Sequence, residues 1–256
     1  MDKAKQHKSL TNNVNFGQDC LILVGRKAIH DAINNSFLLS RIRQVCLSSS
    51  QHHLLQLCDQ FHLPVLIKPK SWFKQKFSHD NHQNCCLYIK AKKTINLDQL
   101  IERTKNKTKS VVLMLDQIQD PHNFGAIIRT AVATNVDAII ISSHNQVKLT
   151  TTVLKVSAGS GLLIDIIEVN NLNMALEKLK KAAYWSYATL LDHHAQNFKK
   201  IDYAPKSVLI VGNEGNGISH LLSKNTDFKI KIPMNQAVES LNVAVATGIL
   251  LYQILC

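Results

Sequence analysis

The polar residues best suited to chemistry lie in three short segments of the second half of the chain. These are residues 120–130, 212–217 and 232–242, and each follows a short apolar run typical of a buried strand. Ligands of open parallel sheets bind beyond the carboxyl ends of the strands, so the segments predict one site built from three loops. The candidate side chains are those of Asn123, Arg129, Glu214, Ser240 and Asn242.

The first segment has the features of a helix start. Asp120 followed by Pro121 predicts an N-cap with proline in the first turn. Asn123 and Arg129 are six positions apart, so they do not share one helical face. One of them could face the loop while the other reaches a partner surface. The alternative is that Asp120 and Asn123 only cap the helix and Arg129 is an ordinary surface residue.

The second and third segments exclude several familiar sites. Residues 212–217 follow a GxxGxG pattern, which differs from the dinucleotide fingerprint GxGxxG, and no GK[ST] sequence follows as in a P-loop. Three glycines around Glu214 indicate a backbone wrapped closely around a ligand, unless the segment is a flexible turn. Ser240 lacks a GxSxG context, so a hydrolase nucleophile is not supported, and Ser240 and Asn242 could be helix caps.

The elements that must position these loops form an α/β pattern. Apolar strands separated by helices predict a parallel sheet covered on both faces. The predicted strands are residues 111–115, 138–142, 162–169, 187–191, 207–211 and 228–232. The predicted helices are residues 123–135, 151–156, 172–182, 218–224 and 241–255.

The first half of the chain predicts a separate small α/β domain. Its strands are expected at residues 20–24, 41–47, 64–67 and 86–91, with helices at 27–34 and 50–61. The polar stretch 92–110 is interpreted as a linker with one or two helical turns. The predicted division is therefore a first domain at 18–91, a linker at 92–110 and a second domain at 111–256.

Positive charge is concentrated in the first part of the chain. Residues 1–110 contain 18 Lys or Arg and 7 Asp or Glu, whereas residues 111–256 contain 12 and 11, so +11 of the net +12 lies in the first part. This distribution is expected of a domain that binds phosphates, although a solvated basic surface is the alternative. Trp72 and Phe73 lie among four lysines and could stack on bases, or could belong to the core.

Metal binding, membrane insertion and secretion are not indicated. The six cysteines form no CxxC pair, so we expect ordinary thiols and no metal site. No run of 18 apolar residues exists, and the polar, basic N-terminus does not resemble a signal peptide. We therefore expect a cytoplasmic protein without a membrane partner.

Together the three segments resemble the motifs of the SpoU (TrmH-like) family of RNA ribose 2′-O-methyltransferases, part of the SPOUT class. The first half is similar to the small substrate-binding domain, with a ribosomal-protein-like fold, that precedes the catalytic domain in many members. The layout is most similar to members that methylate a guanosine in the peptidyl-transferase loop of large-subunit (23S) rRNA. The matching residues are Asp120-Pro121-x-Asn123-x-Gly125 with Arg129-Thr130, Gly212-Asn213-Glu214-Gly215-x-Gly217, Ile232-Pro233-Met234 with Ser240-Leu241-Asn242-Val243, and Val24-Gly25-Arg26-Lys27-Ala28-Ile29.

The resemblance implies a trefoil-knotted methyltransferase domain, a homodimer with the active site at its interface, and S-adenosylmethionine as the cofactor. The cofactor contacts, largely from the backbone, are then expected at Gly212, Gly217, Ile232, Met234 and Leu241. Asn123, Arg129, Glu214, Ser240 and Asn242 match the family's active-site positions. Gln236 departs from the family pattern, which usually has a glycine there.

Two other functions remain open at this point. One is the same reaction on tRNA. The other is an RNA-binding, ribosome-associated factor that has kept the fold and lost catalysis, although the intact candidate residues disfavour it.

Overall fold

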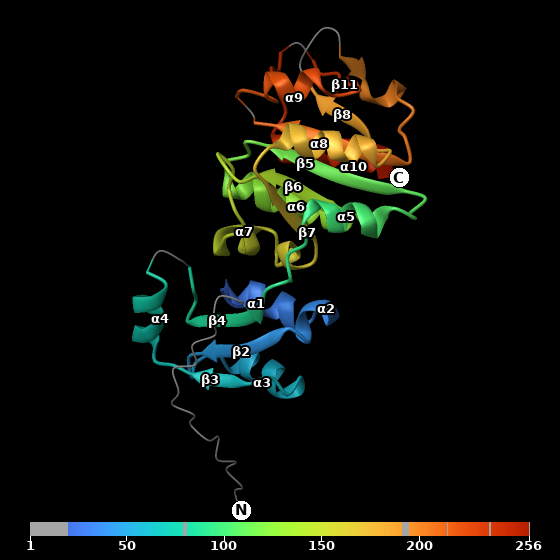
Figure 1. Cartoon of the computed structure of the whole chain (residues 1–256). Coiled ribbons are helices and arrows are strands. Elements are labelled where there is room, and N and C mark those ends of the chain that lie inside the picture. Colours follow the sequence, from blue (N-terminus) through green and yellow to red (C-terminus); the bar gives the residue numbers. More distant parts are fainter. Residues whose placement is uncertain (1–19, 79–80, 191–194, 214, 236, 256) are drawn as a thin grey trace, which may run out of the picture. The chain divides into compact units, whose positions relative to one another are not determined.

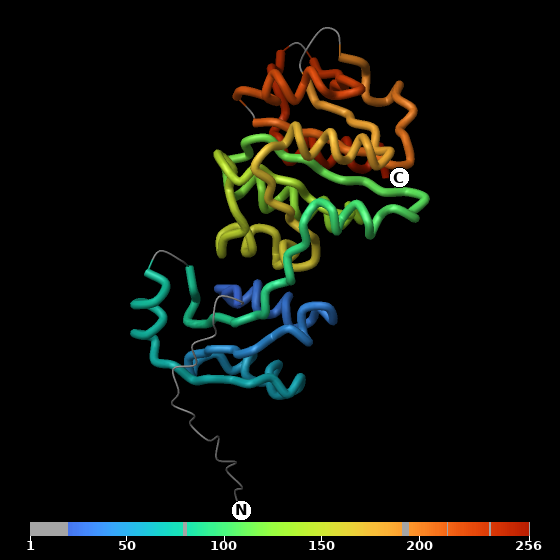
Figure 2. The backbone as a smooth tube through the Cα atoms, in the orientation of Figure 1, coloured from blue at the N-terminus to red at the C-terminus, as the bar shows by residue number. Residues whose placement is uncertain are grey.

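The computed structural model describes residues 20–78, 81–190, 195–213, 215–235 and 237–255 (Figure 1). Contacts divide the chain into two compact units, the first ending at Ala91 and the second beginning at Lys92. Figure 2 follows the backbone through both units. Each unit has its own sheet and its own buried cluster of apolar side chains, so each is stabilised by its own packing.

The first unit is a four-stranded sheet with helices. The strand order is β1-β4-β2-β3, in which β4 is antiparallel to both neighbours and β2 is parallel to β3. The strands are β1 (Cys20–Val24), β2 (Ile42–Leu47), β3 (Val65–Ile67) and β4 (Cys85–Lys90). The helices are α1 (Arg26–Ile33), α2 (Ser36–Leu39), α3 (His52–Gln60) and α4 (Lys70–Lys76). The predicted elements are present within two residues of their expected bounds, and α2 and α4 are additional.

Helix α4 contains the aromatic pair noted in the sequence. Phe73 is completely buried and belongs to the core cluster of the unit. Trp72 is half-buried, and the Nζ atoms of Lys68 and Lys76 lie 5.7 and 5.0 Å from the centroid of its ring. The core interpretation is therefore correct for Phe73, and the ring of Trp72 already interacts with two cations of its own chain.

The second unit is built on a seven-stranded sheet in which every strand pair is parallel. The strand order is β7-β6-β5-β10-β8-β11-β9, so β5 and β10 are central. The strands are β5 (Ser110–Asp116), β6 (Ala138–Ser142), β7 (Asp165–Val169), β8 (Trp185–Thr189), β9 (Gln196–Asn197), β10 (Lys206–Gly212) and β11 (Phe228–Lys231). The predicted parallel α/β sheet is confirmed, with β9 as an added edge strand.

Helices cover both faces of this sheet. On one face α5 (Leu97–Thr104), α8 (Leu172–Lys181) and α9 (His220–Lys224) form a buried cluster with Val112 and Met114 of β5. On the other, α6 (Pro121–Ala133), α7 (Thr151–Val156) and α10 (Val243–Leu255) pack with Leu113 and Leu115. Successive residues of β5 thus face opposite layers, as the period of two in a strand requires.

The segment interpreted as a linker is part of the second unit. Helix α5 begins with a capping box between Asn96 and Gln99 and buries Leu97 and Leu100. The carboxylate of Asp165, with only 3% of its side chain exposed, pairs with Lys92 at 2.8 Å and with Arg103 on α5. The helical turns expected within this segment are therefore present, but they pack on the sheet and do not form part of a linker.

A buried polar network lies at the amino end of β5. Ser110 Oγ donates a hydrogen bond of 2.6 Å to Asp137 Oδ2 and lies 2.6 Å from Tyr184 Oη. Tyr184 Oη in turn donates to Thr104 Oγ1 at 2.8 Å. The network connects α5 with the segments that lead into β6 and β8.

One strand is shorter than predicted. Residues 162–169 are mostly apolar, but only Asp165–Val169 is strand, and the 3-10 helix η1 (Ser160–Leu162) precedes it. Gly159 before η1 adopts a left-handed conformation with φ 81°. A short apolar run does not distinguish a strand from a buried helical turn, which explains the difference.

Candidate active site

The three candidate segments meet at the carboxyl edge of the parallel sheet. They follow β5, β10 and β11, and all three strands run in the same direction. This is the edge at which open α/β sheets bind ligands. The prediction that the segments lie together is therefore confirmed, although the strands are not all adjacent, because β8 lies between β10 and β11.

The end of β5 and the loop after it form hydrogen bonds with the glycine segment and the residues that follow it. Asp116 is buried, and its Oδ2 accepts a hydrogen bond of 2.8 Å from the backbone N–H of Ser219. Asp120 caps α6 by accepting from the N–H of His122 at 2.9 Å, with Pro121 in the first turn, as predicted. Helix α6 then presents Asn123 half-buried near its start and Arg129 exposed two turns later.

The glycine segment after β10 folds back on itself. Asn213 and Gly217 exchange two backbone hydrogen bonds of 3.0 and 2.9 Å. The Oδ1 of Asn213 accepts from the N–H groups of Gly215 and Asn216, while its Nδ2 donates to the carbonyl oxygen of Gln117. One asparagine side chain therefore orders this segment and attaches it to the loop after β5.

Two glycines of this segment are required by its geometry. A Cβ atom on Gly212 would lie 2.2 Å from the backbone of Gly217, so any side chain there would force the backbone to shift. Gly217 has a φ of +66°, the left-handed region that glycine adopts without strain. The close approach in this structure is between Gly212 and Gly217, whereas the glycine spacing predicted an approach to a ligand, which stays a prediction.

The third segment is connected to the first through Asn242. Its Oδ1 caps α10 by accepting from the N–H groups of Ala244 and Val245 at 3.0 and 3.3 Å. Its Nδ2 donates a hydrogen bond of 2.9 Å to Oδ1 of Asn123. The cap interpretation and the site interpretation of Asn242 are therefore compatible, because one amide group serves both contacts. Helix α10 begins at Val243, two residues later than predicted.

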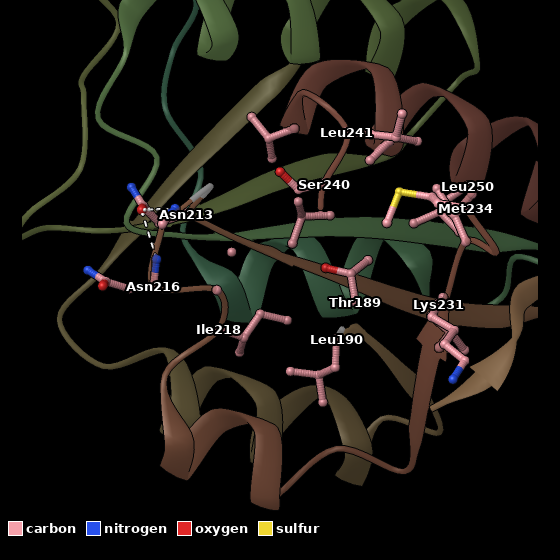
Figure 3. A pocket seen from close by; sticks show the side chains of 18 residues that line it. Thr189, Leu190, Asn213, Asn216, Ile218, Lys231, Met234, Ser240, Leu241 and Leu250 are labelled. Carbon is pink, nitrogen blue, oxygen red and sulfur yellow. Dashed lines mark hydrogen bonds between the residues drawn. The ribbon is translucent and has the colours of Figure 1, made fainter. Parts of the chain in front are cut away.

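A cavity of about 350 Å³ lies among these segments (Figure 3). In Figure 3, Ser240, Leu241 and Met234 lie on one side, and Leu190 and Ile218 lie opposite. The volume of this cavity is within the range of about 300–1,000 Å³ that is usual for small-molecule and cofactor sites. The residues predicted to contact a cofactor all line it: Gly212, Gly217, Ile232, Met234 and Leu241.

The predicted catalytic residues are distributed differently. Ser240 lines the cavity, whereas Asn123, Asn242 and Arg129 are outside its lining. Glu214 and Gln236 lie outside the described residues. The cavity also includes Thr189 and Leu190 at the end of β8, which the sequence did not single out. The only signal for these two was their position at a predicted strand end, because they belong to no motif.

Comparison with known proteins identifies the family. The sequence model of the SpoU rRNA methylase family matches residues 110–252. The chain belongs to the SpoU rRNA methylase family. A second model, described as RNA 2′-O ribose methyltransferase substrate binding, matches residues 22–95. The two SpoU matches cover both units of the structure.

Relatives and solved structures agree with this assignment. An uncharacterised tRNA/rRNA methyltransferase of Mycoplasma pneumoniae is 40% identical over 92% of this chain and 97% of that protein. An AdoMet-bound rRNA methyltransferase from Sinorhizobium meliloti has a similar fold, with a TM-score of 0.70, 23% identity and coverage of 92% and 87%. The TrmH/SpoU tRNA modifying enzyme of A. aeolicus is 35% identical, with a TM-score of 0.54 and coverage of 62% and 80%.

As a SpoU family member, the chain is an S-adenosylmethionine-dependent RNA methyltransferase, which confirms the predicted family and cofactor. RNA as the substrate class is also supported by the model that matches the first unit. Among the described residues, no helix is long and apolar enough to cross a membrane.

Proposed function

We propose that this protein transfers a methyl group from S-adenosylmethionine to the 2′-hydroxyl of a ribose, that of a guanosine in large-subunit rRNA. The observation that carries the proposal is the hydrogen bond between Asn242 and Asn123 beside the cavity. It joins the first and third segments across 119 positions of sequence, so two residues that match the family's active-site positions are in direct contact. The description of the first unit as a 2′-O ribose methyltransferase substrate-binding domain supports the ribose as the target.

The cavity fits S-adenosylmethionine. Its walls combine apolar side chains such as Leu190, Ile218 and Leu250 with the bare backbone of the glycine segment. An adenine ring is flat and apolar, with edge atoms that main-chain groups can bond, and this cofactor has no phosphate that would need a P-loop. We propose that Gly212, Ile232 and Leu241 contribute main-chain contacts, with Met234 and Gly217 nearby. When bound, the cofactor supplies an activated methyl group on a sulfonium, which is a good leaving group.

The remaining chemistry concerns the ribose hydroxyl, which is a poor nucleophile. We propose that Arg129 contacts the 2′-oxygen and the neighbouring phosphate. Arginine stays protonated, so it stabilises the developing alkoxide by charge rather than acting as a base. Ser240 and Asn242 orient the ribose, and Asn123 and Glu214 hold the arginine and the loops.

A homodimer would bring Arg129 to the reaction. Arg129 is exposed and is not part of the cavity lining of its own chain. Helix α10, which packs against α6, leaves Val245, Ile249 and Tyr252 exposed by 52%, 38% and 54%. These positions follow a helical repeat, so they form one apolar face that a second copy would cover. We propose this face as the dimer interface, and a trefoil knot at the C-terminal segment as the frame of the cofactor cavity.

The substrate is tested by mapping 2′-O-methyl groups in cells with and without the gene. We expect the 2′-O-methyl group of one guanosine to disappear from large-subunit rRNA, with the methyl groups of the tRNAs unchanged. Loss of a tRNA methyl group with intact rRNA would instead support the tRNA alternative. If no methyl group changes and the purified protein does not bind S-adenosylmethionine, the chain is an RNA-binding factor without catalysis.

A further inference from the structure

The first unit contains an open cleft of about 910 Å³ where β1 leads into α1 and where α3 begins. Six of its lining side chains are basic or can become so. They are Arg26, Lys27, Lys70, His30, His52 and His53. Asp31 is the only acid among the described residues that line it. We refer to these residues together as the charged cleft.

The three permanent cations of the charged cleft have no acidic partner among the residues that the structure describes. Within the described ranges, Arg26, Lys27 and Lys70 form no ion pair, and all three are exposed. Six cations of the second unit pair with an aspartate or glutamate, namely Lys92, Arg103, Lys107, Lys148, Lys178 and Lys180. Among the described residues, the cleft cations share the lack of an ion pair with other exposed cations such as Arg43, Lys74 and Lys90, and differ from them by lining one cleft together. Three permanent cations against the single carboxylate of Asp31 give the described lining of the cleft an excess of positive charge, which attracts a polyanion.

The walls of the charged cleft are fixed by specific contacts. Gly25 has a φ of +97°, and this turn directs the chain from β1 into α1 and places Arg26 and Lys27 at the rim. The N–H of Arg26 donates to the side-chain oxygen of Gln83 at 3.0 Å, and the buried side chain of Gln51 donates to the Gln83 carbonyl at 2.6 Å. The backbone that carries Arg26 and Lys27 is therefore held by hydrogen bonds to the neighbouring segment.

Two histidines extend the donor set. The rings of His30 and His53 stack with centroids 6.0 Å apart and an interplanar angle of 26°, which connects α1 with α3. An imidazole can donate an N–H bond to a phosphate oxygen whether or not it is charged. The charged cleft therefore offers donors from α1, α3 and α4.

We propose that the charged cleft binds consecutive backbone phosphates of the RNA substrate. The inference rests on the proposed function for the identity of the polyanion, and it specifies which face of the first unit makes the contact. The aromatic face of α4 is less suitable, because Lys68 and Lys76 already lie over Trp72 and Lys76 also donates to the hydroxyl of Tyr88.

The test compares two triple variants with the same net charge. The first replaces the cleft cations (Arg26→Ala, Lys27→Ala, Lys70→Ala). The control replaces exposed cations of the same unit outside the charged cleft (Arg43→Ala, Lys74→Ala, Lys90→Ala). Affinity for a transcript of the peptidyl-transferase loop of large-subunit rRNA is measured over a series of salt concentrations. Since phosphate contacts carry no sequence information, the result does not depend on which nucleotide is methylated.

We expect the cleft variant to bind at least about 10-fold more weakly and the slope of log K against log salt to fall by about 2–3, as for three lost phosphate contacts. The control should change the affinity by less than about 3-fold. Equal weakening in both variants, or an unchanged slope in the cleft variant, would overturn the proposal, because general charge attraction would then explain the binding.

Two further measurements separate this inference from the proposed function. Calorimetry with S-adenosylmethionine should give the same affinity for both variants and the wild type, which shows that the second unit is folded. If the wild-type protein binds RNA through the charged cleft but methylates no ribose, the proposed function fails and the inference stands. If methylation occurs and the cleft variant binds like the control, the inference fails and the proposed function stands.

Discussion

The proposed role of Arg129 requires a second copy of the chain. In a single chain this residue is exposed and does not line the cavity. Replacing it by alanine should lower the rate of RNA methylation by roughly 10²–10³-fold, as for loss of one group that stabilises developing charge. Arg129→Lys keeps the charge but loses the planar fork, so it should retain a small part of the activity.

Methyl transfer from labelled cofactor measures these rates, and Lys155→Ala on α7 is a control that removes another exposed cation. Full activity in Arg129→Ala would remove this residue from the mechanism.

Gly212 allows a second prediction at the same scale. Gly212→Ala places a Cβ against the backbone of Gly217, and overpacking of this kind costs about 1–3 kcal/mol. Cofactor affinity should therefore fall about 10- to 100-fold, measured by calorimetric titration. Gly215→Ala is the matched control, since its Cβ would approach nothing closer than Asn213 Oδ1 at 3.4 Å. Equal affinities in the two variants would contradict the geometry derived for this segment.

Local features of the candidate segments could be predicted because their residue types are informative. Asp120 with Pro121 indicated the helix start that is present. Glycine spacing indicated a backbone close to a ligand, and the contact that is present joins Gly212 to Gly217. The bond between Asn123 and Asn242 could not be predicted, since each residue by itself is an adequate helix cap and the contact depends on the tertiary fold. Ile218 and Thr189 line the cavity through their position alone, and no sequence pattern marks them.

At the scale of elements, Asp227 connects α8, β8 and the start of β11. It accepts hydrogen bonds from the N–H and Oγ of Ser186 and pairs with Lys180 at 2.7 Å. Burial by itself raises the pKa of Asp227, but the bonds from Lys180 and Ser186 outweigh this effect and hold the pKa below its usual value. The ionised form is thus the one that the folded state favours.

The stability contribution of Asp227 follows from this direction. A lowered folded pKa stabilises the protein above the unfolded pKa of about 4, and the contribution is lost as pH falls through the folded pKa. Asp227→Asn should therefore lower the free energy of unfolding by about 1–2 kcal/mol at pH 7, and the deficit should shrink toward pH 3. Urea unfolding over this pH range measures the difference. Glu168→Gln, in an exposed pair with Lys148, should show little effect at either pH.

Most elements were predictable, and the exceptions have physical reasons. Strand β6 and helix α7 have the predicted bounds. The apolar run of β6 and the helical period of α7 are each flanked by polar residues that mark where the element ends. Helix α4 offers only two adjacent apolar residues, which define no period, and the two-residue strand β9 is too short for any pattern. The helical turns of α5 were expected, but their packing on the sheet depends on the tertiary fold and was not.

At the scale of the whole molecule, the exposed face of α10 predicts self-association. Ile249→Asp places a charge in the middle of this face, which should convert a dimer into a chain of 28.7 kDa in sedimentation velocity. Methylation should be lost with it if Arg129 acts in the partner's site. Met174→Asp on α8, where the methionine is 63% exposed, should leave both properties unchanged. A wild-type protein that sediments as a monomer would exclude the proposed interface.

The central strand β5 separates two kinds of residue along its length. Its amino end is held by the buried network of Ser110, Asp137 and Tyr184, whereas its carboxyl end leads to the loop that supports the cavity. Mutations that alter substrate choice can accumulate at the carboxyl end while the network keeps the fold intact. Evolution of a new target RNA is therefore expected to change the loops at one edge of the sheet, and engineering for heat tolerance can begin at the other.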